Sequence, residues 1–292
     1  MAKFLSKDGK FYMREGKLLG YTPMPEKGKT LNEYTWAEIR QISDANLAAD
    51  YGFKAGDTKS ITINGTIGNT TITNQTVDAV ILGINHNAEK EGNNRIHFLI
   101  GKPSKGPYIK RLCGMTDSQY NTAVSTSGWC SMNTSNTNSG GWKDSYMRQT
   151  FLGNTGTPTE PVENSFLAAL PADLRAEMKS CTKYSDNTGG NTSLASAVTA
   201  TTDYLFLLSE HEVIYGENSN PAEWNNQVRY DYFKEGKGQI AGSWGDPATA
   251  VDWWVRSVRK RYDPYFCCIN TQELPGVGYS IYSKGVLPGF CI

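Results

Sequence analysis

The sequence has no net charge, because 29 Lys and Arg residues balance 29 Asp and Glu residues in a chain of 292. A protein that binds nucleic acid or an anionic membrane through charge needs a positive surplus, so neither partner is expected. No run approaches the roughly 18 apolar residues of a transmembrane helix. The first ten residues also lack the apolar stretch of a signal peptide. We therefore expect neither membrane insertion nor export by the general secretory route.

Signatures of catalysis and metal binding are also absent. The sequence contains no Gly-rich phosphate loop, no nucleophile elbow and no HExxH motif. The histidines are only three and are scattered, although His86 and His97 could meet if their strands pair. The six cysteines include no CxxC pair, and we expect most of them to be buried as small hydrophobic residues. Neither a metal nor a cofactor nor a catalytic residue is predicted.

What the sequence has in abundance is glycine and aromatic side chains, with 29 Gly, 16 Tyr and 7 Trp among many Asn, Ser and Thr residues. This mixture favours turns, short strands and ordered loops over a helical bundle. Strands are predicted at residues 59–63, 77–84, 95–100, 202–208, 253–255, 266–269 and 286–292, and the second of them is apolar enough to be buried on both faces. The pattern predicts an α+β domain with short elements and much ordered coil.

Helices are predicted from their capping signals. Thr35 can cap a helix and Glu38, three residues later, can bond back to the Thr35 amide. Ser209 and Glu212 repeat this arrangement. Further helices are expected at 144–151, 171–178 and, in irregular form, 224–233.

The chain divides into an arm and a body. Residues 9–21 predict a hairpin about a Glu-Gly turn, and Pro23, Pro25 and Gly28 follow as a linker. We therefore assign residues 1–30 to an N-terminal arm and 31–292 to one domain. A lone hairpin is marginal in water, so the arm should pack either on this body or on another protein.

Residues 258–284 lack the regular alternation of apolar and polar residues that is typical of strands, and they are rich in Tyr, Arg and Lys. The segments on either side of them are strand-like and rigid. Such side chains give much contact area for little lost rotamer freedom, which is typical of a binding surface. An ordinary surface loop is the alternative. The basic run 256–262 could instead suggest nucleic acid, but the neutral chain argues against it.

Several segments together resemble an uncharacterised bacterial and phage domain family over roughly residues 31–292. The matching segments, in order, are YTWAEI at 34–39, VILGINHN at 80–87, RIHF at 95–98, GGWKDSYMR at 140–148, LPADLR at 170–175, TDYLFLLSE at 202–210, WWVRS at 253–257 and GVLPGFCI at 285–292. That family looks similar to the C-type lectin-like fold of the formylglycine-generating-enzyme type. The same fold houses the variable proteins of diversity-generating retroelements.

The resemblance implies that residues from about 254 to 284 form a variable ligand-binding region. In retroelement systems a reverse transcriptase miscopies adenines, and the altered copy replaces a segment at the 3′ end of the gene. Here Val258 stands where a proline usually follows Arg-Ser, and Gln272 and Glu273 stand where Asp-Gly is frequent. Replacement of one gene segment would change residues within that segment and leave the sequence on either side matching the family, which is the pattern seen here.

The expected contact residues are those that should point outward from this region. They are Arg259, Lys260, Arg261, Tyr262, Asp263, Tyr265, Gln272, Glu273, Leu274, Val277, Tyr279, Ile281, Tyr282 and Lys284. Trp253, Phe266, Ile269, Val286 and Phe290 are expected in the supporting core. A lectin-like fold holds long loops by Asn, Ser and Thr side-chain bonds, so outward residues can change without unfolding the domain.

These inferences predict a non-enzymatic protein that binds a protein or glycan ligand on a cell surface. It would be displayed on a phage particle, with the N-terminal arm attached to a phage structural protein, or reach a cell surface by a non-classical route. Two alternatives stay open: an oxidase like the formylglycine-generating enzymes, and a structural component of a phage tail. The first would need a paired-cysteine copper site, and no two cysteines can be matched to it from the sequence.

Overall fold

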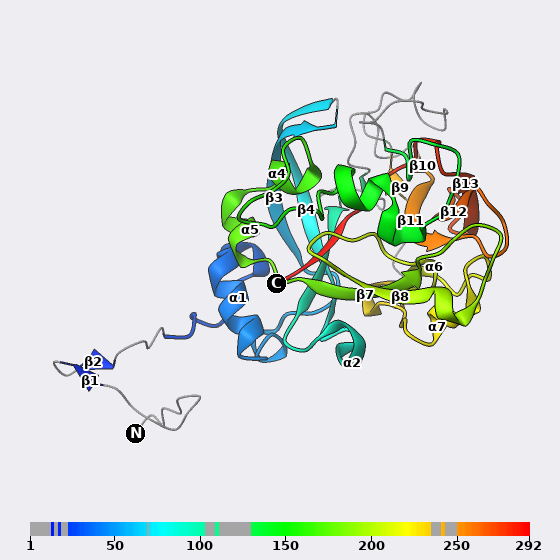
Figure 1. The fold of residues 1–292 in the computed structure, drawn as a ribbon. Coiled ribbons are helices and arrows are strands. Elements are labelled where there is room, and N and C mark those ends of the chain that lie inside the picture. Colours follow the sequence, from blue (N-terminus) through cyan, green and yellow to red (C-terminus); the bar gives the residue numbers. More distant parts are fainter. Residues whose placement is uncertain are drawn as a thin grey trace.

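A computed structural model describes residues 13–14, 17–18, 23–68, 70–102, 109–110, 130–234, 241–242 and 250–292. Short helices and mostly antiparallel strands alternate along the chain, which confirms the α+β class (Figure 1). Long stretches of ordered coil join them, as between β8 (Val198–Asp203) and α6 (Glu210–Val213).

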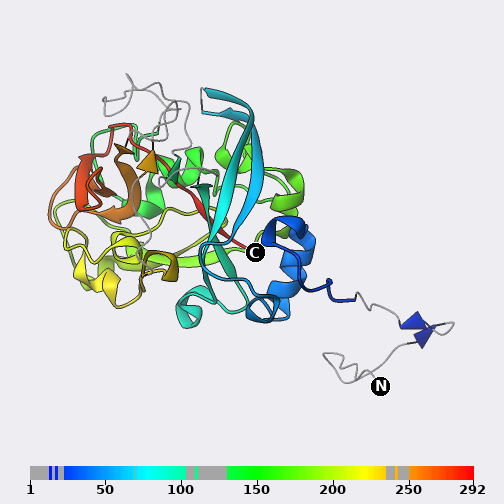
Figure 2. The same ribbon diagram turned by 180° about the vertical axis from the view of Figure 1, so that it is seen from behind.

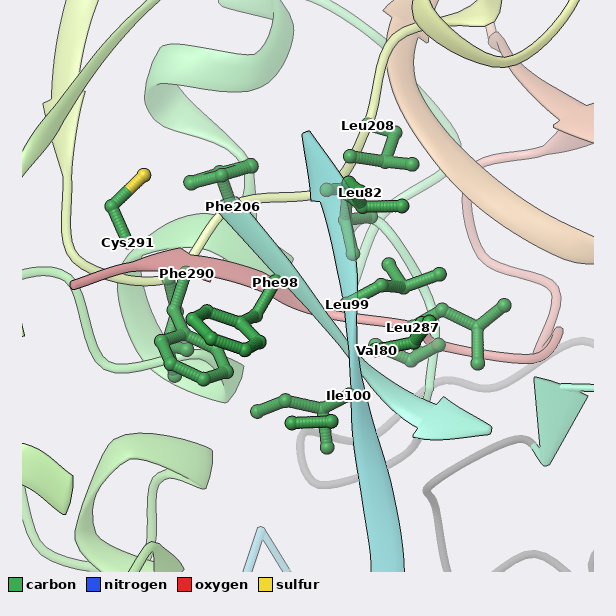
Figure 3. Close-up of a cluster of buried hydrophobic side chains, with 14 of the residues drawn as sticks. Val80, Leu82, Phe98, Leu99, Ile100, Phe206, Leu208, Leu287, Phe290 and Cys291 are labelled. Atoms are coloured by element: carbon green, nitrogen blue, oxygen red, sulfur yellow. The ribbon is translucent and has the colours of Figure 1, made fainter. Parts of the chain in front are cut away.

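The largest sheet has four antiparallel strands in the order β14-β5-β4-β3. They are β3 (Thr58–Ile67), β4 (Thr70–Ile84), β5 (Ile96–Lys102) and β14 (Gly289–Cys291). Residues 77–83 of β4 are all buried, which confirms a strand covered on both faces. Phe98 and Phe290 stack on one face of the sheet, while Leu82, Leu99 and Leu208 gather on the other (Figure 3).

Helix α1 (Trp36–Asp44) covers the phenylalanine face, because Trp36 makes edge contacts with Phe98 and Phe290 at ring-centroid distances of 5.6 and 5.8 Å. The predicted capping box is confirmed: the Thr35 hydroxyl accepts the Glu38 amide, and the Glu38 carboxylate accepts the Thr35 amide. Ser209 and Glu212 form the second predicted box at α6. These local signals were sufficient because all their partners lie within four residues.

The other sheets are smaller. Strands β11 (Trp253–Val258), β12 (Tyr265–Ile269) and β13 (Pro275–Tyr279) form an antiparallel sheet in that order. Strand β7 (Cys181–Asp186) pairs with β8. A third set consists of the two-residue strands β6 (Ile109–Lys110), β9 (Ala241–Gly242) and β10 (Ala250–Val251), and Val251 is buried.

The remaining helices are one or two turns long. They are α2 (Ala88–Glu91), α3 (Gly141–Asp144), α4 (Phe166–Ala169), α5 (Ala172–Glu177), α7 (Pro221–Trp224) and α8 (Asp231–Lys234), with 3-10 turns at Leu31–Glu33, Ala49–Tyr51 and Ala195–Ala197 and a π turn at Met147–Phe151. The helix predicted at 144–151 is thus divided between α3 and the π turn. The one predicted at 224–233 is two separate turns joined by coil.

The strand predicted at 202–208 is wrong beyond Asp203. Residues 204 and 205 form a bend, and residues 204–208 make a single bridge, between Phe206 and Gly289. The side chain of Asn154 accepts the amides of Tyr204 and Leu205 and donates to the Leu205 carbonyl. Because a side chain satisfies these backbone groups, no neighbouring strand is required.

The predicted N-terminal hairpin is present, with β1 (Met13–Arg14) paired antiparallel to β2 (Lys17–Leu18). It lies apart from the body in both views (Figures 1 and 2). Tyr34 and Tyr51 hold the following segment on the body through hydrogen bonds from their hydroxyls to the carbonyls of Glu26 and Pro25.

Most cysteines are buried, as predicted. Cys181, Cys267, Cys268 and Cys291 are buried free thiols, and Cys130 is buried as well. Cys113 lies outside the described residues. Among the residues that the structure describes, no helix combines the length and the apolar character needed to cross a membrane.

Candidate functional site

The predicted contact region lies on the β11-β12-β13 sheet and its loops. The strands themselves supply the buried support, since Trp253, Trp254, Phe266 and Ile269 are fully buried. Val286 and Phe290 are buried too, so the predicted core set is confirmed. The sequence indicated irregular loops through 258–284, whereas β13 pairs with β12 over five residue pairs and adds a third strand. Its two glycines give little sequence signal for a strand.

Thirteen of the fourteen predicted contact residues reach the surface. Tyr262, Leu274 and Tyr279 are exposed large hydrophobic side chains, at 54%, 51% and 37% of their full area. Arg261 and Gln272 are exposed as well. The half-buried members are Arg259, Lys260, Asp263, Tyr265, Glu273, Val277, Ile281 and Tyr282.

Lys284 is the exception, and its assignment as an exposed contact residue is wrong. It is 3% exposed, and its ammonium donates to the Asp252 carboxylate at 2.8 Å and lies 5.5 Å from the centre of the Trp254 ring. Lys284 therefore fixes the end of the region to β11 instead of facing outward.

Four tyrosines form a continuous outer cluster, which we call the tyrosine cluster: Tyr262, Tyr265, Tyr279 and Tyr282. The rings of Tyr265 and Tyr279 lie 4.6 Å apart, and those of Tyr279 and Tyr282 lie 5.2 Å apart. The Arg259 guanidinium links Tyr262 to the others, at 4.4 Å from the Tyr262 ring and 5.6 Å from the Tyr265 ring. Neighbouring aromatic rings with one cation offer an apolar, hydrogen-bonding surface of the kind that recurs at binding hot spots.

The loop that carries Tyr262, residues 259–264, is held by side chains of other segments. The side-chain amide of Asn138 donates to the carbonyls of Tyr262 and Tyr265, at 3.0 and 2.8 Å. The Asp263 carboxylate accepts the backbone N–H of Asn138 at 2.6 Å and the Thr137 hydroxyl at 3.2 Å. Asp263 is thus mainly a loop anchor, although it reaches the surface. The side chains of Thr137 and Asn138 hold this loop, in the way that the resemblance implies for long loops.

Beneath the sheet lies a buried ionic network centred on Arg256. Its guanidinium donates to both carboxylate oxygens of Glu212, at 2.5 and 2.9 Å, and to the hydroxyl of Ser185. Lys183 donates to Glu212 at 3.1 Å and to Glu91 at 2.5 Å. All four ionic side chains are buried, so two positive and two negative groups compensate one another.

The electrostatics of the network follow from burial and mutual contact. Burial opposes ionisation of Glu212, but Arg256 and Lys183 outweigh it and hold the pKa of Glu212 below its usual range. Burial likewise disfavours the charged Lys183, yet Glu212 and Glu91 raise the pKa of Lys183 above its ordinary value. Burial raises the pKa of Glu91 although Lys183 opposes the shift, so the charged core of the network is Glu212 with Arg256 and Lys183. These contacts fix Arg256, and with it β11, against β7 and α6.

Glu223 is a buried carboxyl next to this network. Burial raises its pKa from 4.5 to about 7, against the hydrogen bonds that it accepts from the Asp186 amide and the Ser257 hydroxyl. Between these two pH values the folded protein binds the Glu223 proton more tightly than the unfolded chain does. The resulting stabilisation is complete below pH 4.5 and is lost as the pH rises through about 7.

Glu223→Gln should remove this pH dependence. We expect the stability of the variant, relative to the wild type, to rise by about 2 to 3 kcal/mol between pH 5 and pH 8, because Gln cannot ionise. Urea unfolding at several pH values measures it. Burial lowers the pKa of His86 to about 3, so this residue makes the folded protein less stable as the pH falls. Because His86 is present in both proteins, the difference between their unfolding free energies isolates the contribution of Glu223. Glu217→Gln at an exposed position is the control, and a parallel response there would contradict the assignment.

The structure also brings together buried residues from separate elements. His86, which follows the end of β4, and His97 of the neighbouring strand β5 meet as the sequence allowed, with ring centres 5.6 Å apart. Donor atoms of His97, Cys181 and Cys291 lie within 4.8 Å of one another, and so do those of His86, Glu91 and Glu212. All six side chains are buried. Sequence spacing gave no signal for either group, because their members come from three or more separate elements.

The profile of a family described as "Domain of unknown function (DUF6273)" matches residues 121–292, which is more than half of the chain. The chain belongs to this family. The family match includes α6, β7 and the entire β11-β12-β13 sheet, so it contains the tyrosine cluster and three members of the Arg256 network, namely Arg256, Lys183 and Glu212. The fourth member, Glu91, precedes the matched residues. Neither a curated protein nor a solved structure matches the chain.

Proposed function

We propose that the protein is a non-enzymatic binding module with a C-type lectin-like fold, and that its variable region at about 254–284 contacts a protein or glycan on a cell surface. Display on a phage particle through the N-terminal arm, and diversification by a retroelement, form part of this proposal. The observation that supports it best is the tyrosine cluster, an exposed aromatic surface on a rigid sheet.

The argument rests on the separation of outer and inner side chains. Tyr262 projects from a loop whose backbone is held by Asn138 and Asp263, and Leu274 from a loop held by Asn270. Tyr279 projects from the end of strand β13, which is held by its pairing with β12. Inner residues of the same segments, such as Phe266, are buried. Outer side chains can therefore be exchanged with little effect on the fold, which is the property that a diversified binding surface needs.

The separation predicts different results for outer and inner substitutions. The free energy of unfolding of the triple variant R261A/Y262A/Y279A should lie within about 1.5 kcal/mol of the wild-type value. Each substitution at an exposed position changes this free energy by about 0.5 kcal/mol or less. F266A, at a fully buried position, should lose about 3 to 5 kcal/mol. Equilibrium urea unfolding measures both. Equal losses in the two variants would show that the loops are part of the core.

Binding is tested with the same triple variant on intact bacterial cells and on a glycan array. Truncating tyrosines at a hot spot lowers affinity about tenfold or more per residue, so the triple variant should lose detectable binding. The matched control is L194A/Y215A, which removes two exposed side chains elsewhere, each 63% exposed. Retained binding by the triple variant, or equal loss in the control, would refute the proposed surface.

The retroelement is tested at the DNA level. A reverse-transcriptase gene near the coding sequence, and an imperfect repeat of its 3′ end that differs mostly at adenines, are the expected findings. Codons for outer residues such as Tyr262 and Tyr279 should differ from the repeat, while those for Phe266 and Ile269 should not.

A further inference from the structure

Three side chains of types that can ligate a metal ion lie close together: His97 of β5, Cys181 of β7 and Cys291 of β14. His97 and Cys291 are opposite each other in the β5-β14 pairing. Lys179, two residues before Cys181, bridges to Cys291 and so brings the start of β7 to the same strand. Figure 3 shows the Cys291 side chain on the face of β14 opposite to Phe290. One donor atom from each residue lies within 4.8 Å of the other two.

The imidazole of His97 is incompletely satisfied by protein groups. Its Nδ1 lies 3.1 Å from the Tyr230 hydroxyl and 3.7 Å from a Glu91 carboxylate oxygen. Its Nε2 is buried and has no hydrogen-bond partner. A buried polar nitrogen without a partner costs about 1 to 3 kcal/mol, so such groups call for an explanation. In metal-ligating histidines the other ring N–H usually donates to a carboxylate, a backbone carbonyl or water. In His97 the second ring nitrogen, Nδ1, has the Glu91 carboxylate and the Tyr230 hydroxyl beside it.

The two sulfur atoms are also available. Cys181 and Cys291 are free thiols, both fully buried. The Cys181 sulfur contacts the Cys291 side chain, and it has long contacts to a Glu91 carboxylate oxygen at 3.5 Å and to two carbonyls at 3.9 Å. Thiolates with an imidazole are the ligands that zinc prefers in proteins.

We propose that His97, Cys181 and Cys291 bind one divalent ion of the zinc class. This inference goes beyond the proposed binding function and does not depend on it. When the ion binds, each thiol releases its proton to solvent, so two protons leave and two sulfur-metal bonds form. The ion and two thiolates then add no net charge to an interior in which Glu91, Lys183, Glu212 and Arg256 already compensate one another. Cu⁺ with two thiolates would leave one negative charge buried there.

The second group, His86 with Glu91 and Glu212, is a weaker candidate. The Lys183 ammonium already lies between its two carboxylates, at 2.5 Å from Glu91 and 3.1 Å from Glu212. A metal ion would have to displace this cation. Lys183 also donates to Tyr230 at 2.8 Å, so the position is filled by a well-bonded group of the chain itself.

The site is tested by refolding the whole protein under reducing conditions with Zn²⁺, Co²⁺ or Cu⁺, since its donor atoms are buried. After dialysis we expect about one equivalent of Zn²⁺ by elemental analysis and, with Co²⁺, the charge-transfer absorption of a cobalt-thiolate bond. Zn²⁺ should raise the melting temperature by about 5 °C or more at saturation. Wild-type protein that folds but retains no Zn²⁺, or that retains only Cu⁺, would overturn the proposal.

Variants locate the ion. C181A and C291A should each lower retained Zn²⁺ at least tenfold, whereas C267A and C268A, which remove buried thiols of β12, should retain it. Circular dichroism establishes that each variant is folded. If either cysteine variant cannot fold, the cobalt spectrum of the wild type decides alone, because a spectrum without thiolate absorption is incompatible with the assignment. Zn²⁺ uptake that survives in folded C181A and C291A places the ion elsewhere and refutes it.

Discussion

Glu212→Gln is expected to lower the free energy of unfolding by about 3 to 5 kcal/mol. Glu212 is fully buried and bonds Arg256 through both oxygens and Lys183 through one. The substitution keeps the shape of the side chain but leaves two buried cations against a single carboxylate, Glu91. An uncompensated charge in the interior is far more costly than the loss of an exposed ion pair. Equilibrium urea unfolding at pH 7 measures the change.

The matched control for Glu212→Gln is Asp231→Asn. It makes the same change from acid to amide in an exposed ion pair with Lys234, whose side chains are 57% and 45% exposed. We expect it to cost about 0.5 kcal/mol or less, because solvent screens the pair. Similar losses in the two variants would mean that the Arg256 network contributes no special stability to the sheet beneath the tyrosine cluster.

The same network shows why part of the fold could not be predicted. Arg256 belongs by sequence to a basic run, and a run of cations usually faces solvent. Its position is decided by Glu212 and Ser185, which lie 44 and 71 residues away in the chain. Sequence patterns report on local neighbours, so they place the capping boxes of α1 and α6 correctly but cannot identify a distant charge partner.

The tyrosine cluster was more predictable than the Arg256 network, because residues close to each tyrosine in the sequence indicate that it is exposed. Tyr262 precedes Asp263 and Pro264 in a stretch without strand alternation, which indicates an outward-facing loop position. Tyr279 is exposed as expected, although it ends strand β13 and does not lie in a loop. Lys284 has the same local character, but Asp252 and Trp254 bury it. The meeting of His97, Cys181 and Cys291 had no local signal at all, since it depends on the pairing of β14 with β5 and the approach of β7.

A small number of hydrogen bonds, made by Asn138 and Asp186, hold the backbone segments that connect the tyrosine cluster to the buried core. The Asn138 side chain holds the carbonyl of Tyr262 within the 259–264 loop and that of Tyr265 just after it, and the Asn138 carbonyl accepts the amide of Gly141. Asp186, at the end of β7, accepts the amides of Thr188 and Gly189 and the side chain of Asn220. The position of the tyrosine cluster thus depends on how closely the segments around Asn138 and Asp186 approach each other.

Gly141→Ala tests that close approach and should lower the free energy of unfolding by about 3 to 5 kcal/mol. Gly141 has a φ of +55°, and an added Cβ would lie 2.0 Å from the Asp186 carbonyl oxygen, a backbone atom that cannot turn aside. Gly190→Ala is the matched control, because its φ is +68° but nothing lies within 4 Å of its Cβ position. The control should cost only the left-handed strain of about 1 to 2 kcal/mol. If urea unfolding gives equal losses for both variants, the contact between the segments around Asn138 and Asp186 does not hold the loop that carries Tyr262.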